Sequence, residues 1–577
     1  MFAPATVGKT EHAEATSDVL QTLFGPRRSH DSESLSALRS KRAMPTWRCV
    51  GRLGVRAQSQ ARARHLLYQL ERALAVADAP GVRIRSRRAN PSRIDSMIRP
   101  WLAPVRLNSD ELALLSGWPV GVVGGLSVER SPSALPPSNA IPRSGRLLGM
   151  ATFPGRERSL CLSPTDSLGH LHALGPTGSG KSTLLLNLIT QDLEAGRGVV
   201  VLEPKGDLIS SVLERIPHWR LDDVVLLDPT DAECPVGLNP LASIGRPPEL
   251  IADELLGMFR AMYESWGPRT NDILAAALLT LARSPGMTLC ALPPLLADPT
   301  FRHRIVSKIH DPVGLEPFWA GFEAWSEAER TAAIAPSLNR VRPFLLRPQL
   351  RRVLGQTTPR FDLSRVFSER KVLLVNLAKG PLGSETTGLL GGFVLSQLWA
   401  AALRRSALPP EKRHPVFVYV DEVQDYLRLP TDLGDALVQA RALGVGFVLA
   451  HQHLRQLDPQ TRAALVNARS RICFQLAGED ARTLASGPVS SDDLRELAPY
   501  EAYAELFAGG AVRQWCSLRT LPRAPTTSDA AIVRTRSRDQ FGVAAAEVDA
   551  AVEQLLAGER SSADDVAPRR HVNRGAK

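Results

Sequence analysis

The sequence predicts an α/β fold: a mainly parallel sheet with helices on both faces, an all-helical inserted domain and a small α+β N-terminal domain. Two observations carry this prediction. Short apolar runs such as 198–202 and 224–227 alternate with helical patterns, which is typical of a parallel sheet covered on both faces. From about 247 to 358 the strand patterns stop, and helical patterns such as 250–263 and 272–282 follow one another.

The composition is that of a soluble protein with several domains. The chain has 577 residues, too many for a single hydrophobic core, and 44% of them are hydrophobic. The net charge of +11 at pH 7 is compatible with a polyanionic partner, and equally with arginine-rich solvated faces. None of the six cysteines forms a CxxC pair, which argues against a cysteine zinc site or a disulfide framework and indicates a reducing, cytoplasmic setting.

The hydropathy pattern predicts no membrane span. The N-terminus lacks a charged start followed by an apolar run, so we expect no signal peptide. No stretch of eighteen or more residues is uniformly apolar. The nearest case, 388–403, contains Ser396 and Gln397 and directly follows a strand pattern, which predicts a buried core helix.

Changes in composition divide the chain into seven predicted segments. Proline and serine crowd at 131–142, which marks a linker, and a helical pattern at 61–77 between strand-like runs predicts a small domain before it. In chain order the segments are a loosely ordered N-terminus (1–44), a small basic α+β domain (45–130), a linker (131–145), the first part of the nucleotide domain (146–246), the helical insertion (247–360), the second part of the nucleotide domain (361–530), and a C-terminal helix with a basic tail (531–577).

A phosphate-binding loop is the feature around which the chain is organised. The pattern of a glycine, four residues and then Gly-Lys-Ser begins at Gly175, between an apolar run at 171–174 and an apolar helical pattern at 183–189. Backbone N–H groups of such a loop, together with the helix N-terminus, hold phosphate oxygens. We expect Lys181 to reach the β- and γ-phosphates and the Ser182 hydroxyl to bind Mg²⁺. The predicted nucleotide-binding residues are Gly175, Pro176, Thr177, Gly178, Ser179, Gly180, Lys181, Ser182 and Thr183.

Two later apolar runs end in polar residues that suit nucleotide hydrolysis. Asp421 and Glu422 follow the run 415–420. Behind a phosphate loop, this arrangement predicts that Asp421 holds the Mg²⁺-bound water and that Glu422 is the general base for the attacking water. Gln452 directly follows the run 444–451, and it can either sense the γ-phosphate or simply cap the strand.

Three further acids, Glu203, Asp207 and Asp228, follow predicted strands. Ligands of parallel sheets bind at the carboxyl ends of the strands, so these acids are expected near the nucleotide. A direct role and a role as ordinary loop acids are equally compatible with their positions.

Five segments together resemble a known superfamily. In chain order they read GPTGSGKST, EPKGDL, LLVNLAKGPLG, VFVYVDEVQDYL and ARALGVGFVLAHQ. This set is similar to the HerA–FtsK superfamily of motor ATPases, and most similar to the TraG/TraD-like coupling proteins of conjugative type IV secretion. The resemblance spans about residues 146–522. It implies a RecA-like P-loop NTPase core, ATP and Mg²⁺ as cofactors, and a homo-hexameric ring that threads DNA.

The resemblance also implies roles for single residues. Gln452 matches the family's strand-end glutamine, and Arg441 matches an arginine that reaches the nucleotide of the neighbouring subunit. In a ring the site lies at a subunit boundary, where an added cation offsets charge that builds on the γ-phosphate. Arg469 and Arg471 are competing candidates for this cation. Glu203 departs from the family's usual aspartate at its position.

The predicted function is ATP-driven DNA translocation in conjugative transfer through a type IV secretion system. Expected partners are single-stranded or duplex DNA held through its backbone, a relaxase and channel components of the secretion system. The expected location is the cytoplasm, peripherally at the inner face of the cell membrane. Two alternatives stay open: a soluble HerA-like translocase in repair or segregation, and a nucleotide-gated platform that recruits DNA or protein with little hydrolysis. Lys205 and the arginines of the insertion are candidates for lining a pore.

Overall fold

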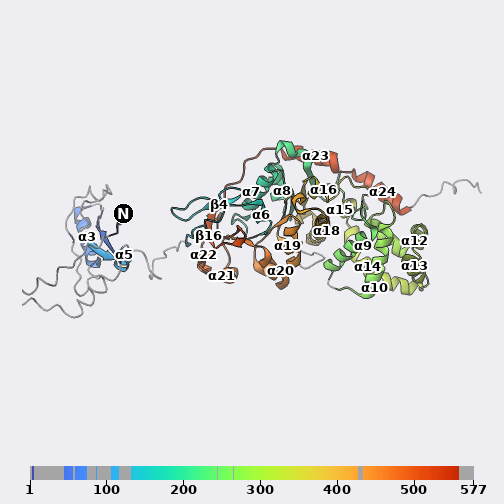
Figure 1. Cartoon of the computed structure of the whole chain (residues 1–577), viewed down its shortest axis with the longest axis horizontal. Coiled ribbons are helices and arrows are strands. Elements are labelled where there is room, and N and C mark those ends of the chain that lie inside the picture. The colour runs from blue at the N-terminus through green and yellow to red at the C-terminus, as the bar shows by residue number, and fades with distance from the viewer. Residues whose placement is uncertain are drawn as a thin grey trace, which may run out of the picture. The chain divides into compact units, whose positions relative to one another are not determined.

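The computed structural model divides into two compact units, residues 1–129 and 130–577 (Figure 1). In the first unit it describes residues 3–4, 45–55, 57, 59–74, 86 and 105–115. In the second it describes residues 132–242, 245–263, 265–426 and 433–557.

The described part of the first unit contains a small antiparallel sheet and two helices. β2 lies between β1 and β3 and pairs with both. The elements are β1 (Ala3–Pro4), β2 (Thr46–Cys49), α3 (Gln60–Leu74), β3 (Val105–Asn108) and α5 (Ser109–Leu115). The helical pattern at 61–77 thus corresponds to α3, whereas the strand-like run expected after it and most of 1–44 lie outside the described residues.

The second unit is built on an eleven-stranded sheet. Neighbouring strands from β12 to β8 are parallel, whereas the pairs from β12 to β5 are antiparallel. The mainly parallel α/β fold is therefore confirmed. In spatial order the strands are β5 (Ser159–Leu162), β4 (Arg146–Ala151), β16 (Cys516–Arg519), β13 (Glu501–Glu505), β12 (Ser470–Cys473), β6 (Leu171–Leu174), β11 (Val445–His451), β10 (Val416–Asp421), β7 (Gly198–Glu203), β9 (Val372–Asn376) and β8 (Val224–Leu227).

Both faces of this sheet are covered, which explains why its parallel strands are apolar throughout. Along β7, Val199 and Val201 pack into the hydrophobic cluster that includes α7 (Lys181–Glu194) and α8 (Asp207–Leu213). Val200 and Leu202 pack into the larger cluster on the other face, which includes α18 (Ser384–Leu403). Successive residues of a strand point to opposite faces, so a strand buried on both faces must be apolar at every position.

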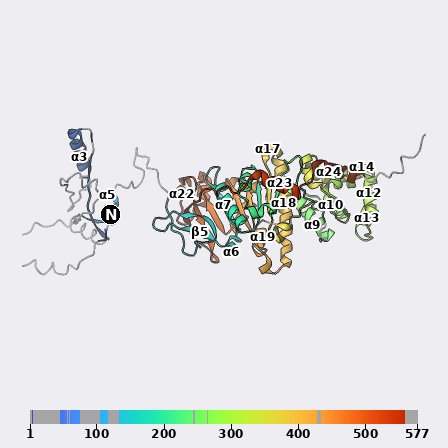
Figure 2. The same cartoon turned by 90° about the horizontal axis from the view of Figure 1, so that it is seen from above.

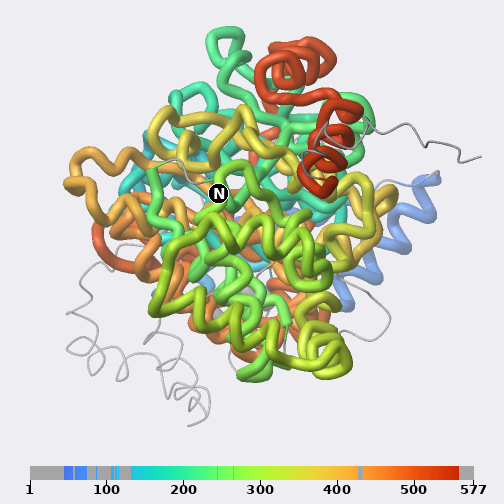
Figure 3. The backbone as a smooth tube through the Cα atoms, turned by 90° about the vertical axis from the view of Figure 1, so that its right-hand side faces the viewer, coloured from blue at the N-terminus to red at the C-terminus, as the bar shows by residue number. Residues whose placement is uncertain are grey.

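The segment after β8 is helical, and it gathers at one end of the second unit. Its helices are α9 (Pro248–Met262), α10 (Pro268–Ala282), α11 (Leu292–Ala297), α12 (Pro299–Val306), α13 (Leu315–Glu323), α14 (Glu327–Leu345), α15 (Pro348–Leu354) and α16 (Arg365–Ser368). Figures 1 and 2 show α9, α10, α12, α13 and α14 beyond α18, on the side away from α7, and Figure 3 views this end directly.

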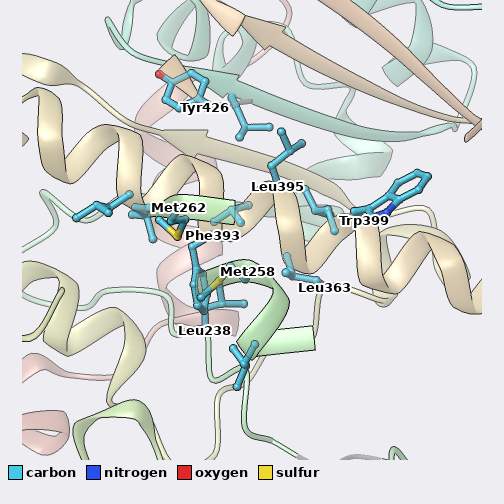
Figure 4. Packing of buried hydrophobic residues seen from close by; sticks show 14 of the residues in the cluster. Leu238, Met258, Met262, Leu363, Phe393, Leu395, Trp399 and Tyr426 are labelled. Atoms are coloured by element: carbon cyan, nitrogen blue, oxygen red, sulfur yellow. The ribbon is translucent and has the colours of Figure 1, made fainter. Parts of the chain in front are cut away.

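The helix α18 joins this helical segment to the sheet. Met258 and Met262 of α9 share one core with Phe393 and Leu395 of α18 (Figure 4). By length and composition, the described helical stretch 384–407 could cross a membrane, but 89% of its apolar window is buried inside the protein. It is the core helix that the pattern at 388–403 predicts.

The predicted linker and the predicted C-terminal helical segment are both packed against this unit. Within 132–145, the Ser133 carbonyl accepts a hydrogen bond from the Tyr503 hydroxyl at 2.6 Å. At the other end of the chain, α24 (Ala545–Ala557) is preceded by α23 (Ala530–Phe541). The sequence predicts one helix in this segment and does not predict α23. The Leu226 N–H of the edge strand β8 donates to the Ser537 hydroxyl of α23 at 2.8 Å, so α23 shields that edge.

Candidate nucleotide site

The phosphate loop adopts a conformation that only glycine allows at three positions. Gly178 and Gly180 have φ angles of 85° and 114°, in the region that L side chains rarely adopt. A Cβ on Gly175 would lie 2.6 Å from the Ser179 hydroxyl and 2.7 Å from Cβ of Phe474. The loop therefore closes tightly between β6 and α7, as the spacing of its glycines predicts.

Lys181 brings the loop together with the two acids at the end of β10. Its Nζ lies 3.4 Å from Oδ1 of Asp421 and 3.9 Å from Oε1 of Glu422. All three side chains are at least 95% buried. Burial raises the pKa of Asp421, and the charge of Lys181 opposes that rise. Ser182, the other predicted Mg²⁺ ligand, is exposed in the first turn of α7.

Glu422 is held by neighbours on several sides. Its Oε1 accepts a hydrogen bond from Nε2 of Gln452, and its Oε2 accepts one from Nε2 of Gln424 at 3.1 Å. Burial alone would raise the pKa of Glu422, but Lys181 and these two amides outweigh it and hold that pKa below its ordinary value. The backbone of Glu422 has a φ of 53°, a strained conformation that is typical of functional sites.

Gln452 connects the loop to this carboxylate. It follows β11, the strand between β6 and β10, and its Oε1 accepts a hydrogen bond from the Thr177 hydroxyl at 3.3 Å. Its Nε2 donates to Glu422, so one side chain contacts both the loop and the acid. A change at the loop can therefore reach Glu422 through Gln452.

Lys205 belongs to the same cluster, although the sequence suggests it only as a pore residue. Its Nζ lies 3.3 Å from Oε1 of Glu422. Glu203 shapes the turn that presents it, because the Glu203 carboxylate accepts hydrogen bonds from the backbone N–H groups of Lys205 at 3.0 Å and of Gly206 at 2.6 Å. Burial raises the pKa of Glu203 to about 7. Apart from its neighbours in the EPKGD block, nothing in the sequence pairs Lys205 with an acid 217 residues away.

The other two acids considered from the sequence lie farther along the sheet edge. Asp207 is in the first turn of α8. Asp228 follows the edge strand β8, three strands from β10, where it accepts a hydrogen bond from Nδ2 of Asn376 at 2.8 Å and lies 3.5 Å from Arg534. Asp228 thus tethers the edge of the sheet and does not reach the loop.

The three candidate arginines lie at the opposite edge of the sheet from the loop. Arg441 precedes β11, and Arg469 and Arg471 lie at the start of β12, whereas the loop follows the carboxyl end of β6. No arginine of this set can therefore serve the loop of its own chain. They line an open hollow of about 530 Å³ together with Glu505.

Contacts within this hollow distinguish the three arginines. Arg471 lies 4.0 Å from the Glu505 carboxylate. The guanidinium groups of Arg469 and Arg441 instead lie 3.7 Å and 5.2 Å from the centre of the Phe507 ring. The two arginines on Phe507 are better placed to meet an anion that enters from outside the chain.

The part of the chain around the phosphate loop matches a known protein family. Residues 151–272, which include the phosphate loop, β7 and the start of the helical insertion, match the model of a family described as type IV secretory system conjugative DNA transfer. This part of the chain is therefore similar to that family. The resemblance inferred from the five segments is thereby confirmed.

Several solved structures are similar to the chain. The conjugative coupling protein TrwBΔN70 is 18% identical, covers 70% of this chain and 97% of its own, and superimposes with a TM-score of 0.48. TrwB in complex with ADP and Mg²⁺ is 18% identical over 71% of this chain and 99% of its own, with a TM-score of 0.47. VirB4 of Thermoanaerobacter pseudethanolicus is 14% identical over 68% of this chain and 99% of its own, with a TM-score of 0.42. No curated protein matches the sequence.

Proposed function

We propose that this protein is an ATP-driven DNA motor, a coupling-protein-like ATPase that serves conjugative DNA transfer through a type IV secretion system. The observation that carries the proposal is the contact of Lys181 with Asp421 and Glu422, with Gln452 joining that cluster to the phosphate loop. The family match over 151–272 supports the assignment to conjugative transfer. DNA, a relaxase and channel components are the partners that follow from it, at the inner face of the membrane.

The residues present fit ATP with Mg²⁺. The exposed Ser182 hydroxyl and the Asp421 carboxylate are oxygen donors of the kind that Mg²⁺ prefers. Ser182 directly follows Lys181, and the Nζ of Lys181 lies 3.4 Å from Asp421. In the described part of the chain no group of three or more His, Cys, Asp or Glu side chains could hold a metal by itself. A Mg²⁺ ion bound here would take most of its ligands from the nucleotide phosphates, and it would offset their negative charge.

The chain's own residues divide the work of hydrolysis. The N–H groups of the loop bind the phosphates, and Lys181 exchanges its contact with Asp421 for the β- and γ-phosphates. Glu422, whose pKa is held low, is ionised at neutral pH and accepts a proton from the attacking water. Gln452 orients the Glu422 carboxylate through its hydrogen bond. Because Gln452 also bonds Thr177, a movement of the loop changes the position of Glu422.

DNA-stimulated ATP hydrolysis tests this function. We expect duplex or single-stranded DNA to raise the turnover of ATP, and Lys181→Ala to abolish that turnover. DNA binding should weaken steeply as salt increases, because phosphate contacts release counterions. Turnover that is indifferent to DNA, with DNA binding insensitive to salt, would contradict the motor and leave a nucleotide-gated platform.

The Lys205 side chain is expected to assist Glu422. Lys205→Ala should lower kcat roughly tenfold, because a hydrogen bond to a charged group is lost. Without this cation the pKa of Glu422 rises toward its ordinary value, so the acid limb of the pH–rate profile should move to higher pH. Lys205→Arg should retain most of the activity. The matched control is Lys379→Ala, since Lys379 pairs with Asp425 at 2.6 Å. A profile unchanged in Lys205→Ala would refute this role.

Arg441 is proposed to act on the site of a neighbouring copy in a homo-hexamer. Arg441→Ala alone should lower kcat roughly a hundredfold or more. When Arg441→Ala and Glu422→Gln subunits are mixed in equal amounts, roughly a quarter of the sites should be active. Those sites combine the intact Glu422 of one copy with the intact Arg441 of its neighbour. Arg471→Ala, whose guanidinium is engaged by Glu505, is the control and should stay active. A mixture as inactive as its components would show that Arg441 does not act between copies.

A further inference from the structure

Tyr500 borders the phosphate loop in a strained backbone conformation. Its φ is 69°, in the left-handed region that non-glycine residues seldom occupy. Two contacts fix it there. The Tyr500 N–H donates to the Ser179 carbonyl of the loop at 2.8 Å, and the Tyr500 carbonyl accepts a hydrogen bond from the Thr520 N–H at 2.9 Å. The loop and the residue that follows β16 therefore hold Tyr500 from two sides.

The ring of Tyr500 is presented to solvent beside the loop. Its relative exposure is 47%, although it is a large aromatic residue. A Cβ placed on Gly180 would lie 3.0 Å from Cδ1 of Tyr500 and 3.2 Å from Cε1 of Phe474. Phe474 is fully buried beneath the loop, so the outer surface on this flank is formed by Tyr500. None of the described residues hydrogen-bonds its hydroxyl.

The order of the strands places Tyr500 on a defined side of the nucleotide. Gln452 follows the strand next to β6 and Glu422 follows the second strand, both in one direction. Tyr500 precedes β13, the second strand from β6 in the other direction. The hydrolytic residues define the end where the γ-phosphate lies. The base of an extended nucleotide projects away from that end, toward the flank that Tyr500 borders.

We propose that the Tyr500 ring is the stacking surface for the base of the bound nucleoside triphosphate. This inference rests on the proposed function, since it concerns the same site. An exposed, rigidly held aromatic ring binds a base through its π-face without needing a partner for its hydroxyl. The two backbone hydrogen bonds of Tyr500 keep the ring beside Gly180, and thus beside the bound phosphates. Tyr500 is here a binding residue, and it takes no part in the proton transfer.

Comparing ATP with inorganic tripolyphosphate tests the proposal. Calorimetric titration of Mg²⁺–ATP into Tyr500→Ala should show roughly tenfold weaker binding than in the wild type, because base–aromatic stacking is lost. Binding of Mg²⁺–tripolyphosphate, which has no base, should be unchanged. Tyr500→Phe should bind ATP as the wild type does. Tyr500→Gly removes the ring and also relieves the strain, so it should lose the same affinity as Tyr500→Ala.

The alternative outcomes separate the two proposals. Equal affinity of wild type and Tyr500→Ala for ATP would overturn the stacking role, as would a parallel loss for ATP and tripolyphosphate, which indicates that Tyr500 only supports the loop. Trp219→Ala is the matched control, because Trp219 is 64% exposed and packs near Gly196 at the far end of α7. A wild-type protein that binds neither ligand would refute the proposed function itself.

Discussion

Glu422→Gln is expected to lower the turnover of ATP by roughly 10²–10⁴-fold, the usual contribution of a general base. The amide keeps the shape of the side chain but cannot accept the proton of the attacking water. Nucleotide affinity should be preserved, because Lys181 and the loop are untouched. Single-turnover hydrolysis and equilibrium binding of ATP, measured on the same preparation, separate the two effects.

Asp425→Asn provides the matched control for this change. Asp425 lies three residues after Glu422 and pairs with Lys379, so the same chemical change there should leave turnover near that of the wild type. If Glu422→Gln hydrolysed ATP as fast as Asp425→Asn, Glu422 could not be the base.

Asp192→Ala is expected to destabilise the second unit by about 3–5 kcal/mol, which is the usual effect of breaking a buried ion pair. Asp192 is fully buried and accepts hydrogen bonds from Arg146 at 2.9 Å and from the Tyr419 hydroxyl at 2.5 Å. The substitution leaves the guanidinium of Arg146, which is 2% exposed, without a counter-charge. Urea unfolding followed by circular dichroism measures the loss.

The buried pair matters for the site because of what it connects. Arg146 begins β4, Asp192 lies on α7 behind the phosphate loop, and Tyr419 lies on β10, two residues before Asp421. Asp222→Ala is the control, because Asp222 is exposed and pairs with Arg536 at the surface at 2.8 Å. Asp222→Ala should lower the free energy of unfolding by at most about 1 kcal/mol. Equal destabilisation by the two substitutions would contradict the role given to the buried pair.

The parts of this site that the sequence predicts are those encoded locally. The loop occupies nine consecutive positions between its flanking strand and helix, and Asp421 and Glu422 lie at the end of one apolar strand. Parallel strands bring their carboxyl ends to one edge, so the meeting of Lys181 with these acids could also be anticipated. The helical insertion was predictable for the same reason, since periodicity is a property of a short window.

The remaining parts depend on contacts between distant segments. Lys205 meets an acid 217 residues away, and Tyr500 reaches the loop only because β13 returns antiparallel beside β12. No local pattern at either position predicts these contacts. The strand order, the cover that α23 gives to β8, and the separation of Arg441 from its own loop likewise follow from topology that a periodicity pattern does not contain.

The central claim is that the loop and the two acids form one site for a nucleotide with Mg²⁺. Its most direct test is a structure of the protein with Mg²⁺ and a non-hydrolysable ATP analogue. We predict that the loop 175–183 surrounds the triphosphate and that Lys181 contacts the phosphates in place of Asp421. Ser182 and Asp421 should lie beside the metal ion. An analogue bound elsewhere, with Lys181 still paired to Asp421, would contradict it.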